Sequence, residues 1–221
     1  MNKLIPCDKA ADMIFDGAAV MFGGFMANGS AENIIDALVK TGVKNLTIIC
    51  NDSGFIDKGV GKLISAKQCA KLITSHIGLN KETGRQMTEG ELDVELVPQG
   101  TLIERIRCGG YGLGGVLTQT GLGTLVEEGK QKVEVDGVTY LLEKPLRADF
   151  SILFGAVVDK NGNIVYRGST NNFNEMMASA ADIVIVEAAE VAEIGDINPN
   201  HVKTPGIFVD YIVDGKEAQN G

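Results

Sequence analysis

The sequence predicts an α/β protein with a mostly parallel, open sheet flanked by helices and an antiparallel hairpin excursion. In the first half of the chain, short apolar strand segments alternate with segments of helical periodicity, as in parallel βαβ units. After Gly109 the pattern changes to shorter strand segments around Asp-Gly and Asn-Gly pairs, which are typical of hairpin turns. The 221 residues suffice for one domain with a buried core. We expect a single domain over residues 1–214 and a polar tail over residues 215–221 that frays.

The first expected strand, residues 18–22, runs into a cluster of glycines. A helix is expected to begin at Ser30, a good N-cap residue, and to stop at Gly42, because the apolar residues between them recur at helical spacing. Residues 46–50 form the next expected strand, and their continuous apolar run is typical of a parallel strand buried on both faces. Further expected elements are a helix over residues 65–71, a strand over 72–76, a helix over 81–90, a strand over 94–97 and a helix over 101–107.

In the second half, residues 133–135 and 139–142 are expected to pair around Asp136-Gly137, and Asn161-Gly162 marks a second turn. Parallel character is expected to return with a helix over residues 173–181, a strand over 183–186 and a late strand over 207–213. We find no internal repeat, low-complexity tract or linker, which favours one domain.

The composition excludes several classes of function. The formal net charge is −9 and the basic residues are scattered, whereas nucleic-acid binding needs basic patches and anionic membrane surfaces repel an acidic chain. No apolar run approaches the ~20 residues that span a bilayer, and the first residues lack the apolar segment of a signal peptide. The cysteines are widely spaced, as in proteins with reduced thiols: Cys7, Cys50, Cys69 and Cys108. We expect a cytoplasmic protein that has no metal site and binds neither nucleic acid nor membrane.

The loop after the first strand is one candidate ligand site. In open α/β sheets, ligands sit at the carboxyl ends of strands, where loops lead into helices. Glycines let the backbone approach a ligand closely, and the following helix N-terminus favours a carboxylate, a phosphate or a developing oxyanion. The alternative is that the glycines only permit a tight turn. The candidate residues are Gly23, Gly24, Phe25, Met26, Ala27, Asn28 and Gly29.

Gln99, within residues 97–101, is the second candidate. A neutral amide at a strand end can donate a hydrogen bond to a carbonyl oxygen as it becomes negative, and removing such a donor typically costs ~10²–10³ in rate. The alternative is a surface glutamine in a Pro-Gly turn.

Other polar and glycine-rich features have simpler explanations. Gly110, Gly112 and Gly115 match GxGxxG, but they follow an expected helix instead of a strand, so we interpret them as a pliable loop near the site or a subunit contact. His76, at a strand end, could reach a ligand, but neither it nor His201 has the spacing of a metal ligand. The acidic residues are expected to cap loops (Asp52 and Asp57) or to lie on solvated faces (Glu104, Glu187, Glu190 and Glu193).

Several motifs together resemble family I CoA-transferases. The residues that carry the resemblance are residues 16–25 with Gly29, Gly78 with 82–84, 97–102, 107–110, 120–124 with 127–130, and 204–206. They run through nearly the whole chain in the family's order, and they are most similar to the A (α) subunits of acetate/butyrate–acetoacetate CoA-transferases. One departure is Ala31, where the family usually has proline; we expect altered stability of the helix start and unchanged chemistry.

The resemblance implies a CoA-transferase-like fold and an enzyme that exchanges coenzyme A between a short-chain acyl-CoA and a free acid. Coenzyme A is then a substrate, the kinetics are ping-pong, and no metal or redox cofactor is needed. The nucleophile would be a glutamate in a Ser-Glu-Asn-Gly-type motif of the B (β) subunit, a motif that this sequence lacks. Gln99 would be the oxyanion donor and residues 23–29 would line the acyl/CoA pocket, in an A–B complex doubled by symmetry to a heterotetramer.

Two other classes of function stay open from the sequence. A sugar-phosphate isomerase on a related sheet needs an acid/base pair at strand ends, and no convincing pair is present. A non-catalytic binding or regulatory module needs no such pair, although the retained Gln99 and glycine loop argue against it. The sequence does not identify the acids exchanged, because a pocket distinguishes one methylene by only ~1–3 kcal/mol.

Overall fold

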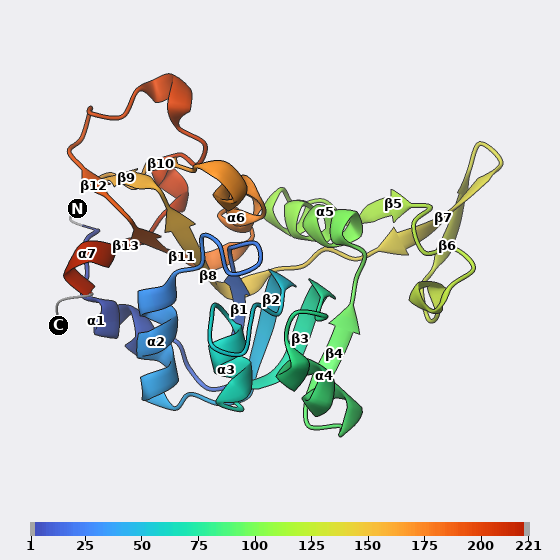
Figure 1. Cartoon of the computed structure of the whole chain (residues 1–221). Coiled ribbons are helices and arrows are strands. Elements are labelled where there is room, and N and C mark those ends of the chain that lie inside the picture. The colour runs from blue at the N-terminus through green and yellow to red at the C-terminus, as the bar shows by residue number, and fades with distance from the viewer. Residues whose placement is uncertain (1–2, 219–221) are drawn as a thin grey trace.

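The computed structural model describes residues 3–218, which fold around a seven-stranded sheet whose neighbouring strands all run parallel (Figure 1). The strands of this sheet are β1 (Ala19–Phe22), β2 (Leu46–Asp52), β3 (Cys69–His76), β4 (Asp93–Leu96), β8 (Ala148–Gly155), β11 (Ala181–Ala188) and β13 (Tyr211–Asp214). Their spatial order is β13–β11–β8–β1–β2–β3–β4. The predicted open α/β fold is confirmed, and its main sheet is entirely parallel.

The chain winds outward from the centre of the sheet in two directions. From β1 it reaches the edge strand β4 through α2 (Glu32–Thr41), α3 (Gly61–Ser65) and α4 (Lys81–Thr88). After α5 (Gln99–Gly110) it returns to β8, which pairs with β1, and continues through α6 (Asn174–Met177) to the opposite edge. β1 and β8 therefore form the topological switch point, the place where ligands bind in open α/β sheets.

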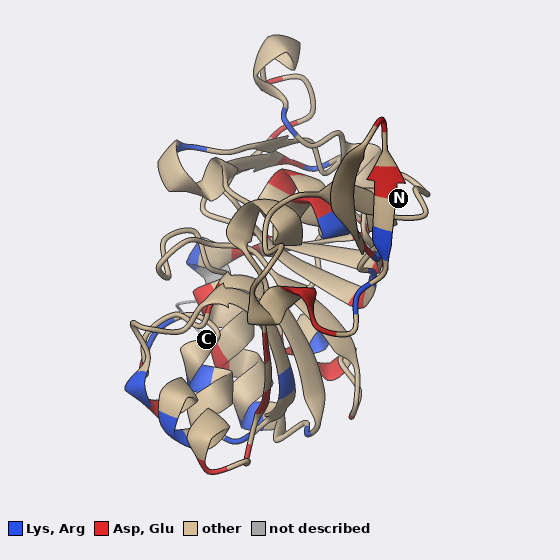
Figure 2. Cartoon of the chain, turned by 90° about the vertical axis from the view of Figure 1, so that its right-hand side faces the viewer, with Lys and Arg blue, Asp and Glu red and all other residues tan. Residues whose placement is uncertain are grey.

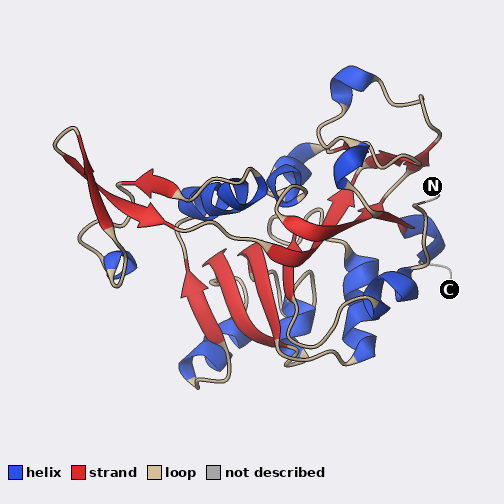
Figure 3. Ribbon diagram, turned by 180° about the vertical axis from the view of Figure 1, so that it is seen from behind, coloured by secondary structure: helices blue, strands red, loops and turns tan. Residues whose placement is uncertain are grey.

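An apolar core covers each face of the sheet, and Figure 3 shows helices on both sides. Val20 and Ile48 face the core that includes α1 (Cys7–Asp12), α2 and α3. Their sequence neighbours Met21 and Ile49 face the second core, with α5 and α6. Because successive strand residues point to opposite faces, burial on both faces requires continuously apolar strands.

Both expected hairpins form, but in two small sheets of their own and not as an extension of the main sheet. β6 (Lys132–Val135) and β7 (Val138–Glu143) pair antiparallel around Asp136 and Gly137, whose φ values of 52° and 75° suit a type I′ turn. With β5 (Val116–Thr118) they form an arm that projects from the body (Figures 1 and 3). The second sheet consists of β9 (Val157–Asp159), β10 (Ile164–Val165) and β12 (Val191–Ala192).

Three expected elements have wrong boundaries because neighbouring elements include their residues. The helix expected over residues 65–71 overlaps α3 only at its first residue, since Lys67 adopts a φ of 56° and β3 follows at once. The helix expected over 173–181 is limited to α6, because β11 already begins at Ala181, the last residue of the expected helix. The strand expected over 207–213 starts as a 3-10 turn and becomes β13. The central strand β8 and the first helix α1 were not predicted.

The remaining elements are η1 (Leu125–Glu127), η2 (Gly168–Asn171), η3 (Pro199–His201), η4 (Gly206–Phe208) and α7 (Gly215–Ala218). Helix α7 occupies the start of the expected polar tail, and residues 219–221 lie outside the described residues. No helix within residues 3–218 combines the length and apolar character needed to cross a bilayer. Figure 2 shows basic and acidic residues interspersed along the chain.

Glu187 supplies the side-chain hydrogen-bond acceptor at the N-terminus of α2, where Ser30 contributes its backbone carbonyl to the Glu32 N–H at 2.9 Å. The N-cap residue, Ala31, has no side-chain acceptor. Glu187 on β11 is 3% exposed; its Oε2 accepts the Ile34 N–H at 3.0 Å and its Oε1 accepts the Asn33 side-chain amide at 2.9 Å. The expectation of a solvated Glu187 is therefore wrong, because the unpaired N–H groups of a helix start need an acceptor and β11 places one there.

The environment of Glu187 also changes its acidity. Burial raises the pKa of this carboxyl to about 7, and the hydrogen bonds from α2 oppose the rise. Glu190 and Glu193, by contrast, are exposed as expected.

We predict that Glu187→Gln removes a pH-dependent part of the free energy of unfolding. Because the folded pKa lies above the ~4.3 of an unfolded glutamate, the contribution of this carboxyl is fully present below that value and is lost as the pH rises through about 7. In urea unfolding, the free energy of unfolding of the wild-type chain should fall by about 2–3 kcal/mol between pH 5 and pH 8, relative to that of Glu187→Gln. Glu193→Gln, at an exposed position, should keep the wild-type pH dependence. Parallel pH profiles for wild type and Glu187→Gln would contradict the prediction.

Candidate functional site

The loops that follow β1, β2 and β4 come together where the strands end. We call this end of the sheet the carboxyl edge. The Met26 backbone N–H, in the loop after β1, donates to Asp52 Oδ2 at 2.9 Å. Gln99 Nε2, beyond β4, donates to Asn51 Oδ1 at 2.6 Å. Two consecutive residues at the end of β2 thus connect both candidates from the sequence, the glycine loop and Gln99.

Gln99 is the first residue of α5, so it belongs to a helix that was expected to begin two residues later. Pro98 is the N-cap residue of this helix. The Gln99 side chain is exposed, and one hydrogen of its amide is used in the bond to Asn51. The second hydrogen on Nε2 has no partner among residues 3–218, so it can donate outward from the edge.

Two buried residues at the end of β2 hold this arrangement. Asn51 is 2% exposed, and its Nδ2 donates to Asp52 Oδ2 at 2.8 Å. Asp52 Oδ1 also accepts the Gly54 N–H at 3.0 Å, which confirms the expected loop-capping role of Asp52. Sequence reasoning missed Asn51, which links this carboxylate to Gln99; Asp57 is exposed.

The glycine loop after β1 ends in a two-residue turn. Phe25 and Asn28 exchange backbone hydrogen bonds of 3.0 and 2.9 Å, and the two residues between them, Met26 and Ala27, have φ values of 50° and 60°. Residues with side chains rarely adopt this conformation, and it costs about 1–3 kcal/mol each. The hydrogen bond from Met26 N–H to Asp52 helps to hold the strained turn.

Three glycines of this loop have reasons inside the chain itself. A Cβ on Gly23 would lie 1.9 Å from Asn174 Oδ1, and a Cβ on Gly29 would lie 2.2 Å from Thr170 Cγ2. Gly24 has a φ of 119°, a conformation that favours glycine. Internal packing therefore accounts for these glycines, and the exposed part of the loop is its tip.

A second loop of the same kind follows β2. Both loops carry the pattern Gly-Phe-x-x-x-Gly, at residues 24–29 and 54–59. Phe55 and Lys58 exchange backbone hydrogen bonds of 3.2 and 3.3 Å, as the corresponding residues of the first loop do. The sequence therefore contains one short repeat that was overlooked, and the recurrence of this pattern after two neighbouring apolar strands is the signal that reveals it.

The histidines and the third glycine cluster lie apart from this arrangement. His76, at the end of β3, and His201, in η3, are exposed. Within residues 3–218, no group of three or more His, Cys, Asp or Glu side chains is suited to hold a metal ion. Gly110 ends α5, and Gly112 and Gly115 lead toward β5, so the GxGxxG match does not open a helix as a dinucleotide fingerprint must.

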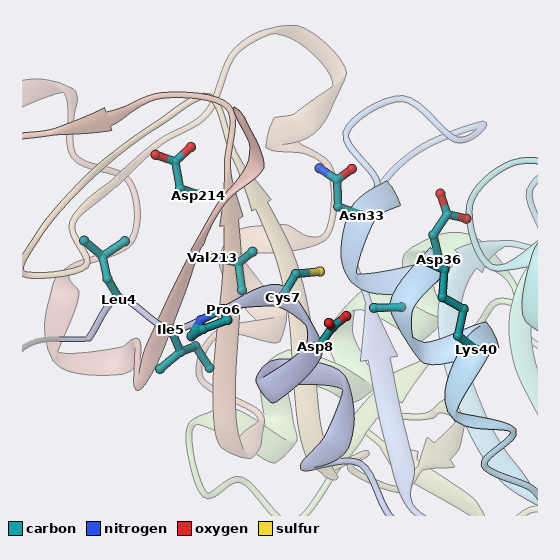
Figure 4. A pocket seen from close by; sticks show the side chains of 11 residues that line it. Leu4, Ile5, Pro6, Cys7, Asp8, Asn33, Asp36, Lys40, Val213 and Asp214 are labelled. Carbon is teal, nitrogen blue, oxygen red and sulfur yellow. The ribbon is translucent and has the colours of Figure 1, made fainter. Parts of the chain in front are cut away.

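Two cavities differ in what they can hold. A cavity of about 550 Å³ lies between the N-terminal segment, α1, α2 and β13 (Figure 4), with Cys7, Asn33 and Lys40 in its lining. Burial raises the pKa of the Cys7 thiol to about 11, so it is a poor nucleophile near neutral pH. The cavity between the two glycine loops measures only about 10 Å³. This cavity is therefore too small to enclose an organic ligand between the two loops of the described chain.

We predict that Gly23→Ala destabilises the chain by about 1–3 kcal/mol, because the new Cβ would overlap Asn174 Oδ1. Asn174 accepts the Phe154 N–H and donates to Thr170 O, so moving it would leave buried groups unpaired. Gly84→Ala is the matched control: the space around its Cβ is open in α4, and it should stabilise the chain by about 0.5–1 kcal/mol. Thermal or urea unfolding measures both variants, and a Gly23→Ala variant as stable as wild type would show that Asn174 yields easily.

A family profile and individual protein sequences both match nearly the full chain, and both identify coenzyme A transferases. A profile of the family described as coenzyme A transferase matches residues 6–215. The chain is 50% identical over 218 residues to acetate CoA-transferase subunit alpha of Escherichia coli K12, and the match covers 99% of each chain. It is 50% identical over 212 residues to the alpha subunit of acetoacetyl-CoA:acetate/butyrate CoA transferase of Clostridium acetobutylicum, covering 96% of this chain and 97% of that subunit.

Solved structures share the fold. Glutaconate coenzyme A-transferase from Acidaminococcus fermentans matches with a TM-score of 0.84 at 16% identity, covering 96% of this chain and 75% of that chain. An acyl-CoA transferase from Escherichia coli O157:H7, solved as a thioester complex with CoA, matches with a TM-score of 0.84 at 20% identity. That match covers 97% of this chain and 47% of the transferase, so this chain spans about half its length.

Proposed function

This chain belongs to the coenzyme A transferase family as an alpha-type subunit, and we propose that its enzyme exchanges coenzyme A between a short-chain acyl-CoA and a free carboxylic acid of the acetate, butyrate and acetoacetate class. The observation that carries this proposal is the full-length likeness to two alpha subunits whose names state such an activity. The hydrogen bond that holds the Gln99 amide at the carboxyl ends of the strands supports a chemical role for Gln99.

The proposed reaction is covalent, ping-pong catalysis. A glutamate carboxylate of a partner B subunit attacks the thioester carbonyl, the C–S bond breaks, and coenzyme A leaves as a thiolate, so that the acyl group and the glutamate form a mixed anhydride. The thiolate then attacks the glutamyl carbonyl, the anhydride C–O bond breaks, and the donor acid leaves as its carboxylate. The acceptor acid takes coenzyme A from the glutamyl thioester by the same steps in reverse. These steps balance without a metal or redox cofactor, and coenzyme A is a substrate.

Gln99 is the proposed oxyanion donor of this chain. Each step of the reaction places negative charge on a carbonyl oxygen, and a donor already held in position stabilises that charge without reorganisation. The Gln99 amide is exposed at the carboxyl edge and is held by a 2.6 Å hydrogen bond to buried Asn51. The neighbouring tip of the loop formed by residues 23–29 would line the acyl/CoA pocket.

We assign the nucleophile to the partner because the two buried carboxylates that we find near this edge, Asp52 and Glu187, are already engaged. Asp52 accepts the backbone N–H groups of Met26 and Gly54 and the side-chain amide of Asn51. Glu187 is buried against the start of α2. The cavity between the glycine loops is too small for an acyl group, so the partner would also supply the missing walls of the pocket.

The assembly and the compartment complete the proposal. An A–B pair with its active site at the interface, doubled by two-fold symmetry, gives a heterotetramer. The four cysteines are free, and three of them, Cys50, Cys69 and Cys108, are buried. Free thiols suit the reducing cytoplasm, where we propose that the enzyme works.

The two alternatives from the sequence are not favoured. A sugar-phosphate isomerase needs a free acid/base pair at the strand ends, whereas both oxygens of Asp52 already accept hydrogen bonds and, within residues 3–218, none of these comes from His76. A non-catalytic binding module does not explain the full-length likeness to two subunits named as transferases.

We predict that Gln99→Ala lowers the kcat of the two-subunit enzyme by ~10²–10³, because one preorganised oxyanion donor is lost. Since Gln99 is exposed at the start of α5, the thermal unfolding of the chain should change little. Gln119→Ala, which truncates an exposed glutamine on the arm, is the control and should keep wild-type activity. A change of kcat below about threefold in Gln99→Ala would remove Gln99 from this role.

A transfer assay tests the function itself. Acetyl-CoA with butyrate or acetoacetate is incubated with this chain alone and with the chain co-expressed with its partner subunit, and new acyl-CoA is measured by chromatography. We expect transfer only when the partner is present. Transfer by this chain alone would place a nucleophile within it, and absence of transfer by a confirmed complex across a range of acids would favour the binding module.

A further inference from the structure

We propose that Asp52, acting through Asn51, sets which end of the Gln99 amide faces the active site. The inference rests on the proposed function, since it explains why Gln99 presents an N–H and not an oxygen to the substrate. The three residues form a hydrogen-bonded relay, with Asn51 Nδ2 2.8 Å from Asp52 Oδ2 and Gln99 Nε2 2.6 Å from Asn51 Oδ1. Asp52 and Asn51 are positioning residues in this relay, and Gln99 is the group that would touch the reacting oxygen.

The direction of the relay is fixed at Asp52. A carboxylate accepts hydrogen bonds and donates none. Asp52 is buried, and backbone donors hold both of its oxygens: the Gly54 N–H reaches Oδ1 at 3.0 Å and the Met26 N–H reaches Oδ2 at 2.9 Å. A further side chain that meets Oδ2 must therefore be a donor.

Asn51 passes this direction on. The two ends of an asparagine amide have nearly the same shape, so their hydrogen-bond partners decide which way it points. An oxygen facing Asp52 would be repelled, so Nδ2 turns toward the carboxylate and Oδ1 turns toward α5. Asn51 is almost fully buried, and its backbone carbonyl accepts the Ser75 hydroxyl at 2.7 Å. The amide of Asn51 therefore has one arrangement that satisfies both ends.

Gln99 receives its orientation from Asn51. To meet Asn51 Oδ1, Gln99 must present its NH₂ group, and the second hydrogen of that group stays available at the exposed edge. An exposed glutamine without such an anchor would populate several rotamers. The relay thus holds a donor where negative charge develops, whereas the reversed amide would place an oxygen there and oppose the reaction.

Asn51 is the residue through which the relay can be tested. Asp52 also holds the strained turn through the Met26 N–H, so a change at Asp52 alters the loop as well as Gln99. The side-chain hydrogen bonds of Asn51 reach only Asp52 and Gln99 among the described residues. Asn51→Ala therefore separates Gln99 from the carboxylate while the bonds from Met26 and Gly54 remain.

A double-mutant cycle in the purified two-subunit enzyme tests the relay by activity. We expect Asn51→Ala to lower kcat about tenfold, the effect of one hydrogen bond, with KM changed less than twofold. In the Gln99→Ala background, Asn51→Ala should have no further effect, because Asn51 acts only through Gln99. Asn200→Ala, at an exposed position in η3, should match wild type. Independent effects that multiply in the double variant would overturn the relay.

A second measurement does not need an active enzyme. In a ¹H–¹⁵N spectrum of the labelled chain, the side-chain NH₂ pair of Gln99 is identified by its loss in Gln99→Ala. In wild type, we expect the chemical shifts of this pair to differ from those of the exposed Gln119 NH₂ pair. In Asn51→Ala, the chemical shifts of the Gln99 pair should move toward those of Gln119. An unchanged Gln99 pair in Asn51→Ala would overturn the relay even in an active enzyme. If the Gln99 signals move as expected but the purified two-subunit complex has no transferase activity, the proposed function would be overturned and the relay would stand.

Discussion

The parallel direction of the seven strands is the constraint on which the rest of the structure depends. Parallel strands all end at one edge, so β1, β2 and β4 deliver the glycine loop, the Asn51–Asp52 pair and Gln99 to the same place. The Asp52 carboxylate then joins these segments by accepting hydrogen bonds from both loops and, through Asn51, by orienting Gln99. A single buried acid therefore couples the strained loop tip to the proposed oxyanion donor.

Much of this fold could be predicted because parallel βαβ units leave strong local patterns. The apolar runs of β1 and β2, the stop at Gly42 and the Asp136-Gly137 turn each depend on nearby residues, and each was found. The central strand β8 was missed because the hairpin arm precedes it and interrupts the strand–helix alternation. The end of α3 was misplaced because Lys67, an ordinary helix former, leaves the helix with a positive φ.

The positions of the candidate site residues in the fold were predictable, but the hydrogen bonds that connect them were not. Gln99 and the glycine loop lie where strand ends predict a ligand, and the family resemblance named the same positions. The bond between Asn51 and Gln99 joins residues 48 apart in the sequence, so it follows only from the packing of α5 against the end of β2. Likewise, Glu187 looks like a solvated acid until β11 is placed beside the start of α2, and the close approach of Asn174 to Gly23 follows only from the placement of α6 beside β1.

The central claim is that this chain supplies the oxyanion donor and its partner supplies the nucleophile. Intact-mass spectrometry of the two-subunit complex after brief incubation with an acyl-CoA tests that division most directly. We predict that the partner subunit alone gains the mass of coenzyme A, less one water, and loses it after borohydride treatment. The same gain on this chain, or on neither chain in a complex that transfers coenzyme A, would contradict the claim.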